Sequence, residues 1–288
     1  MASTIRKLLS GIVTVFLIPA TSFAVDMLGN PTQIGLPGTF DIQIGGGRMT
    51  NLDFDVTKTI ATFQVGTASG TYLYQPSTGK VEEDQAFIGL SYVLNSRSLI
   101  FVNLGSGKST SQSSNSRAIG FKLSPQLEES YFKMGLVLRA QQVAIDIDGL
   151  FVPPPLNDGT NAYALNTLYG AINGNEQIKY TRLDAFFGAS IGTGAIRPYG
   201  GVCLSRLSGS DTLSLNETVS VNTSPIGGGT PTTSTQSVSL QAKGDISGSR
   251  YFTGVLGLSF NPDNFMGLTT EIQMGVQNTI AIAGNYKF

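Results

Sequence analysis

The sequence predicts an all-β chain whose strands close into one antiparallel transmembrane β-barrel. Three observations predict it: apolar residues recur at every second position, the best candidate strands are about ten residues long, and short connections alternate with longer ones along the chain. Only 13% of the 288 residues are charged, against about 25% in a typical soluble domain.

The first 24 residues have the pattern of a cleaved signal peptide. Arg6 and Lys7 precede the apolar run Leu8–Ala20, which is too short to cross a membrane as a helix, and Ser22-Phe23-Ala24 fits the small-x-small cleavage rule. Val25 follows, so the cysteine of a lipoprotein is absent. We therefore expect a signal peptide over 1–24, a periplasmic N-terminal segment over 25–37 and a barrel over 38–288.

The last strand, 279–288, shows the alternation best. Ile280, Ile282, Tyr286 and Phe288 share one face, and Thr279, Ala281, Ala283, Asn285 and Lys287 share the other. The same pattern predicts strands upstream, at 38–46, 49–57, 60–75, 85–94, 98–105, 116–124, 131–143, 179–191, 195–207, 246–260 and 265–276. The total is about twelve strands. If the three candidates between 38 and 75 form a single strand, the total falls to ten.

The connections fall into two classes that alternate along the chain. Those at 95–97, 125–129, 192–194 and 261–264 are short, whereas those at 76–84, 105–115, 146–178 and 208–245 are mostly much longer. Outer-membrane barrels place short turns at the periplasmic end and long loops outside the cell. An even number of strands also places both termini in the periplasm. Because residues 208–240 are rich in Ser, Thr and Gly, we expect a flexible surface loop there.

The composition excludes several kinds of site. The chain has no His and one Cys, which removes His-dependent nucleophilic catalysis, imidazole metal sites and an internal disulfide. We therefore expect neither an enzyme nor a cofactor. The formal net charge of −1 argues against nucleic-acid binding. The one weak metal candidate is a calcium site formed by Asp146, Asp148, Asn157 and Asp158.

The C-terminal residues Ile280, Ile282, Tyr286 and Phe288 resemble the assembly signal of Gram-negative outer-membrane β-barrel proteins. This resemblance implies an outer-membrane location and recognition by the barrel-assembly machinery. It also implies contact with outer-membrane lipid and lipopolysaccharide. The chain lacks Trp, so its interfacial aromatic residues must be Tyr and Phe. The resemblance identifies no subfamily and leaves homo-oligomerisation open.

The same alternation places charged residues inside the barrel. The expected lumen-facing charges are Asp41, Asp53, Asp55, Lys122, Lys133, Arg139, Arg182, Asp184, Arg197 and Glu271. If acidic and basic walls face each other across the lumen, they create the transverse field of a channel for passive diffusion of small hydrophilic solutes or ions. The alternative is a closed structural or surface-interaction barrel, filled by salt-bridged side chains, that acts through its long extracellular loops. No apolar lumen stripe supports a transporter of hydrophobic solutes.

Overall fold

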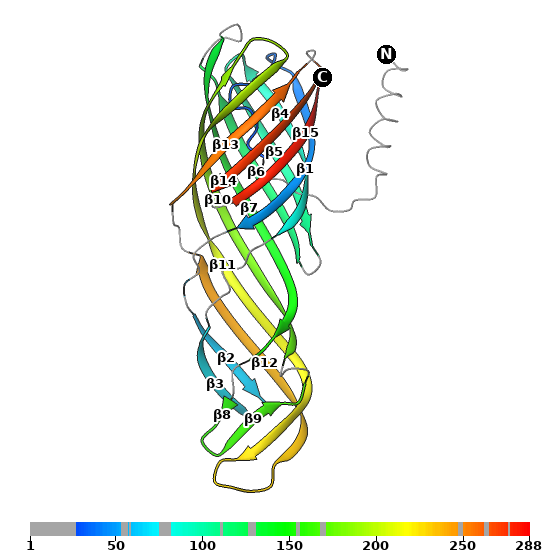
Figure 1. The fold of residues 1–288 in the computed structure, drawn as a ribbon, viewed down its shortest axis with the longest axis vertical. Coiled ribbons are helices and arrows are strands. Elements are labelled where there is room, and N and C mark those ends of the chain that lie inside the picture. Colours follow the sequence, from blue (N-terminus) through cyan, green and yellow to red (C-terminus); the bar gives the residue numbers. More distant parts are fainter. Residues whose placement is uncertain are drawn as a thin grey trace, which may run out of the picture.

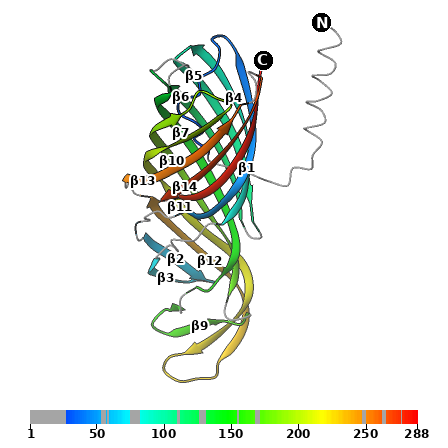
Figure 2. The same ribbon diagram turned by 45° about the horizontal axis from the view of Figure 1, so that its top comes forward.

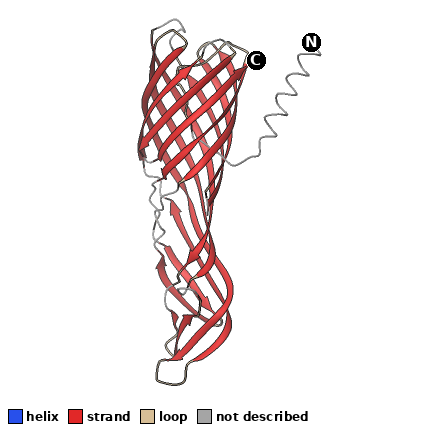
Figure 3. Ribbon diagram, turned by 45° about the vertical axis from the view of Figure 1, so that its right-hand side comes forward, coloured by secondary structure: helices blue, strands red, loops and turns tan. Residues whose placement is uncertain are grey.

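The computed structural model describes residues 27–52, 57, 59–74, 82–109, 112–125, 131–153, 156–167, 171–246, 250–261, 265–275 and 277–288. The predicted signal peptide and the expected lumen residues Asp53 and Asp55 lie outside these ranges. In the part of the chain that is described, no helix has the length and apolar character needed to cross a membrane. Figure 3 shows that the described chain is built from strands and their connections.

Ten strands form a closed antiparallel barrel, and five more lie outside it. The barrel strands are β1 (Phe40–Leu52), β4 (Glu83–Asn95), β5 (Ser98–Lys108), β6 (Gln112–Leu123), β7 (Phe132–Phe151), β10 (Ile172–Ile191), β11 (Ile196–Pro225), β13 (Arg250–Phe260), β14 (Met266–Gly275) and β15 (Gln277–Lys287). Strand β1 pairs with both β4 and β15, and β10 pairs with both β7 and β11, which closes the ring (Figure 1).

The predicted total of twelve barrel strands is wrong, and the alternative total of ten is confirmed. Candidates 38–46 and 49–57 overlap a single strand, β1, which pairs continuously with β4 from Phe40 to Met49. Candidate 60–75 is a hairpin outside the barrel, β2 (Thr59–Val65) and β3 (Ala68–Tyr74). Its turn contains Gly66, whose φ of 57° lies in the left-handed region that glycine adopts without a steric penalty.

Apolar side chains cover the outside of the barrel near its short-turn end, and we call this surface the outer band. Leu183 and Phe187 on β10 are 52% and 55% exposed, whereas Arg182 and Asp184, on either side of Leu183, point inward and are buried. The band includes Ile44, Ile88, Leu90, Ile100, Val102, Leu104, Ile119, Met134, Leu138, Val202, Leu204, Leu256, Leu258, Leu268, Ile272, Ile280 and Ile282. Exposing so many large apolar side chains is unfavourable in water and favourable in a bilayer.

The outer band ends abruptly on neighbouring strands. Ile119, Ala140 and Leu183 stand opposite one another on β6, β7 and β10, and two residues further along the same strands come Arg117, Gln142 and Thr181. Thr181 in turn pairs with Ser208 on β11. The outer surface therefore changes from apolar to polar along one line across the sheet, as expected where a barrel leaves the hydrocarbon layer.

Beyond this line the sheet continues as an extension with its own apolar core. The extension comprises the far parts of β7, β10 and β11 together with β2, β3, β8 (Leu156–Asn157), β9 (Asn161–Leu165) and β12 (Thr232–Ile246) (Figures 1 and 2). Leu213, Leu215, Val221, Val238 and Leu240 are buried in one cluster with Phe63 and Leu156. Burying such a cluster is the main driving force for folding in water.

The flexible loop expected at 208–240 is wrong, because most of that region is a paired hairpin. Strands β11 and β12 pair in register from Gly209–Ile246 to Thr223–Thr232. The apolar residues of β11 alternate with Ser, Thr and Asn, which face outward along the extension. The high hydroxyl content that suggested a loop therefore belongs to the solvent face of two strands.

The chain ends at the short-turn end of the barrel in a cluster of aromatic rings. Phe40 packs against Tyr92 and Phe288, with ring centroids 4.8 and 5.9 Å apart, and Tyr286 stacks with Phe288 at 6.5 Å. The backbones of Phe40 and Phe288 exchange two hydrogen bonds of 3.0 Å. The four residues of the proposed assembly signal are all exposed on the outer face of β15 and at its end.

Candidate functional site

The best-defined polar cluster inside the barrel centres on Asp184. This carboxylate accepts hydrogen bonds from Arg139 Nε at 2.9 Å, Arg182 Nε at 2.7 Å and Ser205 Oγ at 2.5 Å. The two arginines and Asp184 are each no more than 4% exposed. A carboxylate with this many charge-assisted partners is satisfied within the protein. The cluster therefore fills and stabilises the lumen locally.

Residues Met27–Ile34, which we call the interior segment, lie inside the barrel against its inner wall. Glu271 on β14 accepts hydrogen bonds from the backbone amides of Leu28 and Gly29 at 2.9 and 2.8 Å. The same carboxylate accepts from Tyr199 Oη at 2.8 Å and from Gln273 Nε2 at 2.7 Å. Glu271 thus uses its charge to hold the start of the interior segment.

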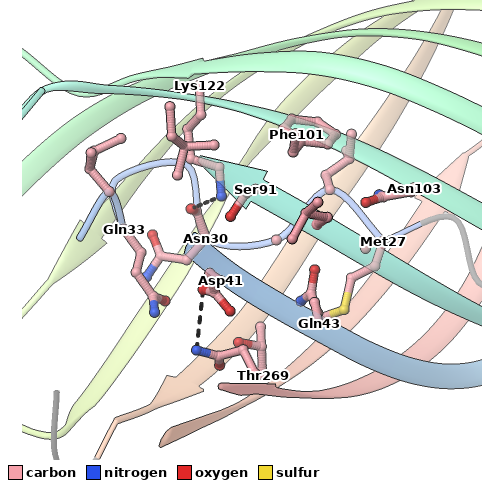
Figure 4. A pocket seen from close by; sticks show the side chains of 17 residues that line it. Met27, Asn30, Gln33, Asp41, Gln43, Ser91, Phe101, Asn103, Lys122 and Thr269 are labelled. Carbon is pink, nitrogen blue, oxygen red and sulfur yellow. Dashed lines mark hydrogen bonds between the residues drawn. The ribbon is translucent and has the colours of Figure 1, made fainter. Parts of the chain in front are cut away.

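Other strands hold the rest of the interior segment. Lys122 Nζ donates to the backbone oxygen of Asn30 at 2.7 Å (Figure 4). Thr32 Oγ1 and Ser190 Oγ lie 2.6 Å apart. These contacts come from β6 and β10 and lie in the part of the barrel that the outer band surrounds. Residues 27–34 of the N-terminal segment predicted at 25–37 are therefore packed within the barrel.

Two glycines make room for the interior segment. Gly135 on β7 and Gly188 on β10 stand opposite each other. A Cβ atom at Gly135 would lie 2.6 Å from the carbonyl carbon of Pro31, and one at Gly188 would lie 2.9 Å from Pro31 Cγ. Any larger residue at these positions would collide with the segment unless it moved.

A small cavity remains beside the interior segment. It has a volume of about 70 Å³ and is lined by Asn30, Asp41, Ser91, Asn103 and Lys122 among others (Figure 4). Asp41 accepts a 3.4 Å hydrogen bond from Asn285 Nδ2, whereas its Oδ1 has no hydrogen-bond partner among the described residues. A polar cavity of this size has room for a few water molecules.

An apolar cluster separates this part of the lumen from the extension. Met49 of β1, Ile145 of β7, Ile178 of β10 and Leu207 of β11 pack together with Tyr180 and Ile246. Strands β1 and β10 lie on opposite sides of the ring. The cluster therefore spans the lumen, and all six of its residues are buried.

The remaining predicted lumen charges have different surroundings. Lys133 points inward from β7 and is buried at 1% exposure. Arg197 lies at a short turn, where its Nε donates to the backbone oxygen of Gly194 at 3.2 Å. The structure thus brings Arg139, Arg182 and Asp184 together in one cluster. Glu271 instead meets the interior segment.

Three buried interior carboxyls were not predicted. Glu83 accepts hydrogen bonds from Gln85 and from Ser114 Oγ, the latter at 2.8 Å. Glu176 and Asp211 are buried on β10 and β11 above the outer band, and burial raises the pKa of Asp211. All three fall in regions that the sequence analysis assigned to loops. Two of the three, Glu176 and Asp211, could have been found from the sequence. The strand alternation continues through Glu176 and Ile178 and through Asp211 and Leu213, and it places both carboxyls on the inward face.

The four residues of the weak calcium candidate are each engaged elsewhere. Asp146 and Asp148 accept hydrogen bonds from Gln177 and Asn175 on β10. The backbone amide of Asn161, the Tyr163 hydroxyl and the amide of Thr160 hold the pKa of Asp158 below its usual range. Across the described ranges, no group of three or more Asp, Glu, Cys or His is placed to hold a metal ion.

No protein-family model matches the chain, and no curated protein matches it in sequence. Similar solved structures include the translocator domain of the autotransporter NalP from Neisseria meningitidis, at 10% identity and a TM-score of 0.36, covering 87% of this chain and 88% of that one. The outer-membrane protease OmpT from Escherichia coli has 8% identity and a TM-score of 0.44, covering 90% and 100%. The Pseudomonas putida toluene transporter TodX has 10% identity and a TM-score of 0.25, covering 87% and 89%.

At these identities the likeness concerns the fold alone. The assignment rests on the molecule itself: a closed ring of antiparallel strands, apolar outside and polar within, which ends in an aromatic cluster. The chain is a closed antiparallel β-barrel with an apolar outer surface.

Proposed function

We propose that this protein is a closed outer-membrane barrel that presents its extension at the cell surface as an interaction module. The observation that carries the proposal is the state of the lumen charges. Arg139, Arg182, Asp184 and Glu271 are buried and bonded within the protein. The interior segment and the apolar cluster around Met49 and Ile178 occupy the space that a channel would need.

The extension supports a role outside the membrane. Its apolar core is enclosed, and the outward positions of β11 there are Ser, Thr and Asn. This is the pattern of a domain that is stable in water, the reverse of the outer band. In this proposal the short turns and both termini face the periplasm, so the extension stands on the extracellular side.

The passive-diffusion channel is the less favoured reading of the same barrel. A channel that orients polar solutes needs charged side chains in contact with water along its length. Arg182 and Glu271 are 1% exposed, and their partners are other groups of the barrel and of the interior segment. The surrounding lipid and the barrel-assembly machinery remain the partners expected for the outer band and for the last strand.

Two measurements test the proposal. The purified protein in a planar bilayer should give no stable ohmic step, with a diffusion porin reconstituted in parallel to prove the assay. A short epitope inserted between Gly227 and Gly228, in the turn that joins β11 to β12, should bind antibody on intact cells. A steady conductance would overturn the closed barrel, and an epitope reached only after the outer membrane is opened would overturn surface display.

A further inference from the structure

An open groove crosses the outer surface of the barrel where the outer band ends. It has a volume of about 680 Å³ and runs across β6, β7, β10 and β11. Arg117, Gln142, Lys179 and Ser208 line its polar side. On the membrane side, Leu104 lines the groove and is 61% exposed, and Ile119 and Leu183 continue the apolar surface below.

The residues that line the groove include two cations and no acid. The two cations, Arg117 and Lys179, are exposed. Gln142 Oε1 accepts a 2.7 Å hydrogen bond from Arg117 Nε, which orients the guanidinium and leaves its terminal amino groups available. Two strand spacings separate β6 from β10, and Lys179 lies two residues along β10 from Thr181, the residue in line with Arg117, so the backbones of the two cations lie about 12 Å apart.

Cations at the corresponding level elsewhere on the barrel have acidic neighbours. Arg48 on β1 forms a 3.7 Å ion pair with Glu82. Lys108 on β5 stands directly opposite Asp84 on β4. Within the groove, neither Arg117 nor Lys179 has an acid directly opposite it in the sheet. The nearest acid in the register is Asp146, which lies diagonal to Lys179 and accepts a hydrogen bond from Gln177.

We propose that the groove binds a phosphorylated lipid of the surrounding outer leaflet, with its phosphate against Arg117 and Lys179 and an acyl chain over Leu104 and Ile119. Guanidinium and ammonium groups form strong charge-assisted hydrogen bonds with phosphate oxygens. The apolar wall below is continuous with the lipid-facing surface, which suits an amphiphile better than a free anion. The inference rests on the membrane placement in the proposed function and adds a specific lipid contact to it.

The test measures binding of bisphosphorylated lipid A to the folded, detergent-solubilised protein by native mass spectrometry and by a titration. The wild type should bind saturably, and the double variant Arg117→Gln, Lys179→Gln should bind at least tenfold more weakly. Inorganic phosphate in large excess should not displace the lipid. The matched control is Lys108→Gln, Lys243→Gln, which removes two exposed cations outside the groove and should change affinity less than twofold.

Two results would overturn the proposal. Equal binding by the groove variant and the wild type would exclude a role for these cations, and displacement by inorganic phosphate at concentrations similar to the lipid would indicate a simple anion site. Both double variants should keep the heat-resistant folded band of the wild type on unboiled gels. They should also give no conductance in the planar bilayer. A loss of lipid binding without conductance then counts against the groove alone, whereas conductance counts against the closed barrel.

Discussion

Arg139 and Asp184 stand directly opposite each other on the neighbouring strands β7 and β10 and bond side by side inside the lumen. Arg182, two residues before Asp184, reaches the same carboxylate. Opposite charges therefore meet along one wall. Acidic and basic walls facing each other across a water-filled space would have left these groups unpaired and exposed.

Replacing Asp184 with Asn should strongly destabilise the barrel. The substitution keeps the shape of the side chain but leaves two buried guanidinium groups without their counter-charge, a loss of about 3–5 kcal/mol for a buried ion pair. The measurement is the urea midpoint of the folded band on unboiled gels. Arg197→Gln is the control, because Arg197 lies outside this cluster and donates to a turn carbonyl in an exposed setting. Equal midpoints for D184N and the wild type would contradict the structural role of this cluster.

Glu271→Gln should loosen the start of the interior segment without unfolding the barrel. The amide accepts fewer hydrogen bonds than the carboxylate that now binds Leu28 and Gly29, and hydrogen bonds to a charged group contribute about 1.5–3 kcal/mol each. Amide exchange at those two residues should therefore accelerate roughly tenfold or more. Thr270→Val, on the opposite face of the same strand, should leave exchange unchanged. Unaltered protection in E271Q would mean that other contacts hold the segment.

Gly135→Val should displace the interior segment from its position against β7. The new side chain would overlap the backbone of Pro31, which packs against the strand there, and overpacking of this kind costs about 1–3 kcal/mol. The expected result is faster amide exchange over residues 30–34 and a lower unfolding midpoint. Gly254→Ala is the comparison, because its Cβ would meet only Met274 O at an ordinary 3.7 Å. If both variants show the same amide exchange and unfolding midpoint, Gly135 does not provide the space for the interior segment.

The sequence predicts the barrel well because lipid exposure leaves a period-two pattern that is independent of long-range contacts. Leu183 and Phe187 alternate with Arg182 and Asp184 in the sequence, and the structure turns the first pair out and the second pair in. The extension was harder to predict. Leu213, Leu215 and Val221 also alternate, but their polar neighbours Ser214, Asn216 and Ser220 suggested a loop, since a soluble strand and a polar loop share the same residue types.

The candidate site was predictable only in part. Alternation places Arg139 and Asp184 inside the barrel. Whether they face each other depends on the pairing register of β7 and β10, which alternation does not determine. The interior segment carries no periodic signal at all. Leu28 and Gly29 contact Glu271 from more than 240 positions away in the chain, and nothing local in the sequence indicates such a contact.

Asp211→Asn should make the stability of the extension less dependent on pH. Burial raises the pKa of Asp211 in the folded protein above its ordinary value of 3.8. The folded state therefore holds this proton more tightly than the unfolded state, so the contribution to stability is complete below pH 3.8 and is lost as pH rises through the folded pKa.

At pH 7 the variant should resist proteolysis of the β11–β12 hairpin better than the wild type, and at pH 4 the two should converge. Asp245→Asn, at an exposed carboxyl on β12, should show no such difference. A D211N hairpin that is less stable than the wild type at pH 7 would mean that the ionised carboxylate, and not the proton, is what the extension requires.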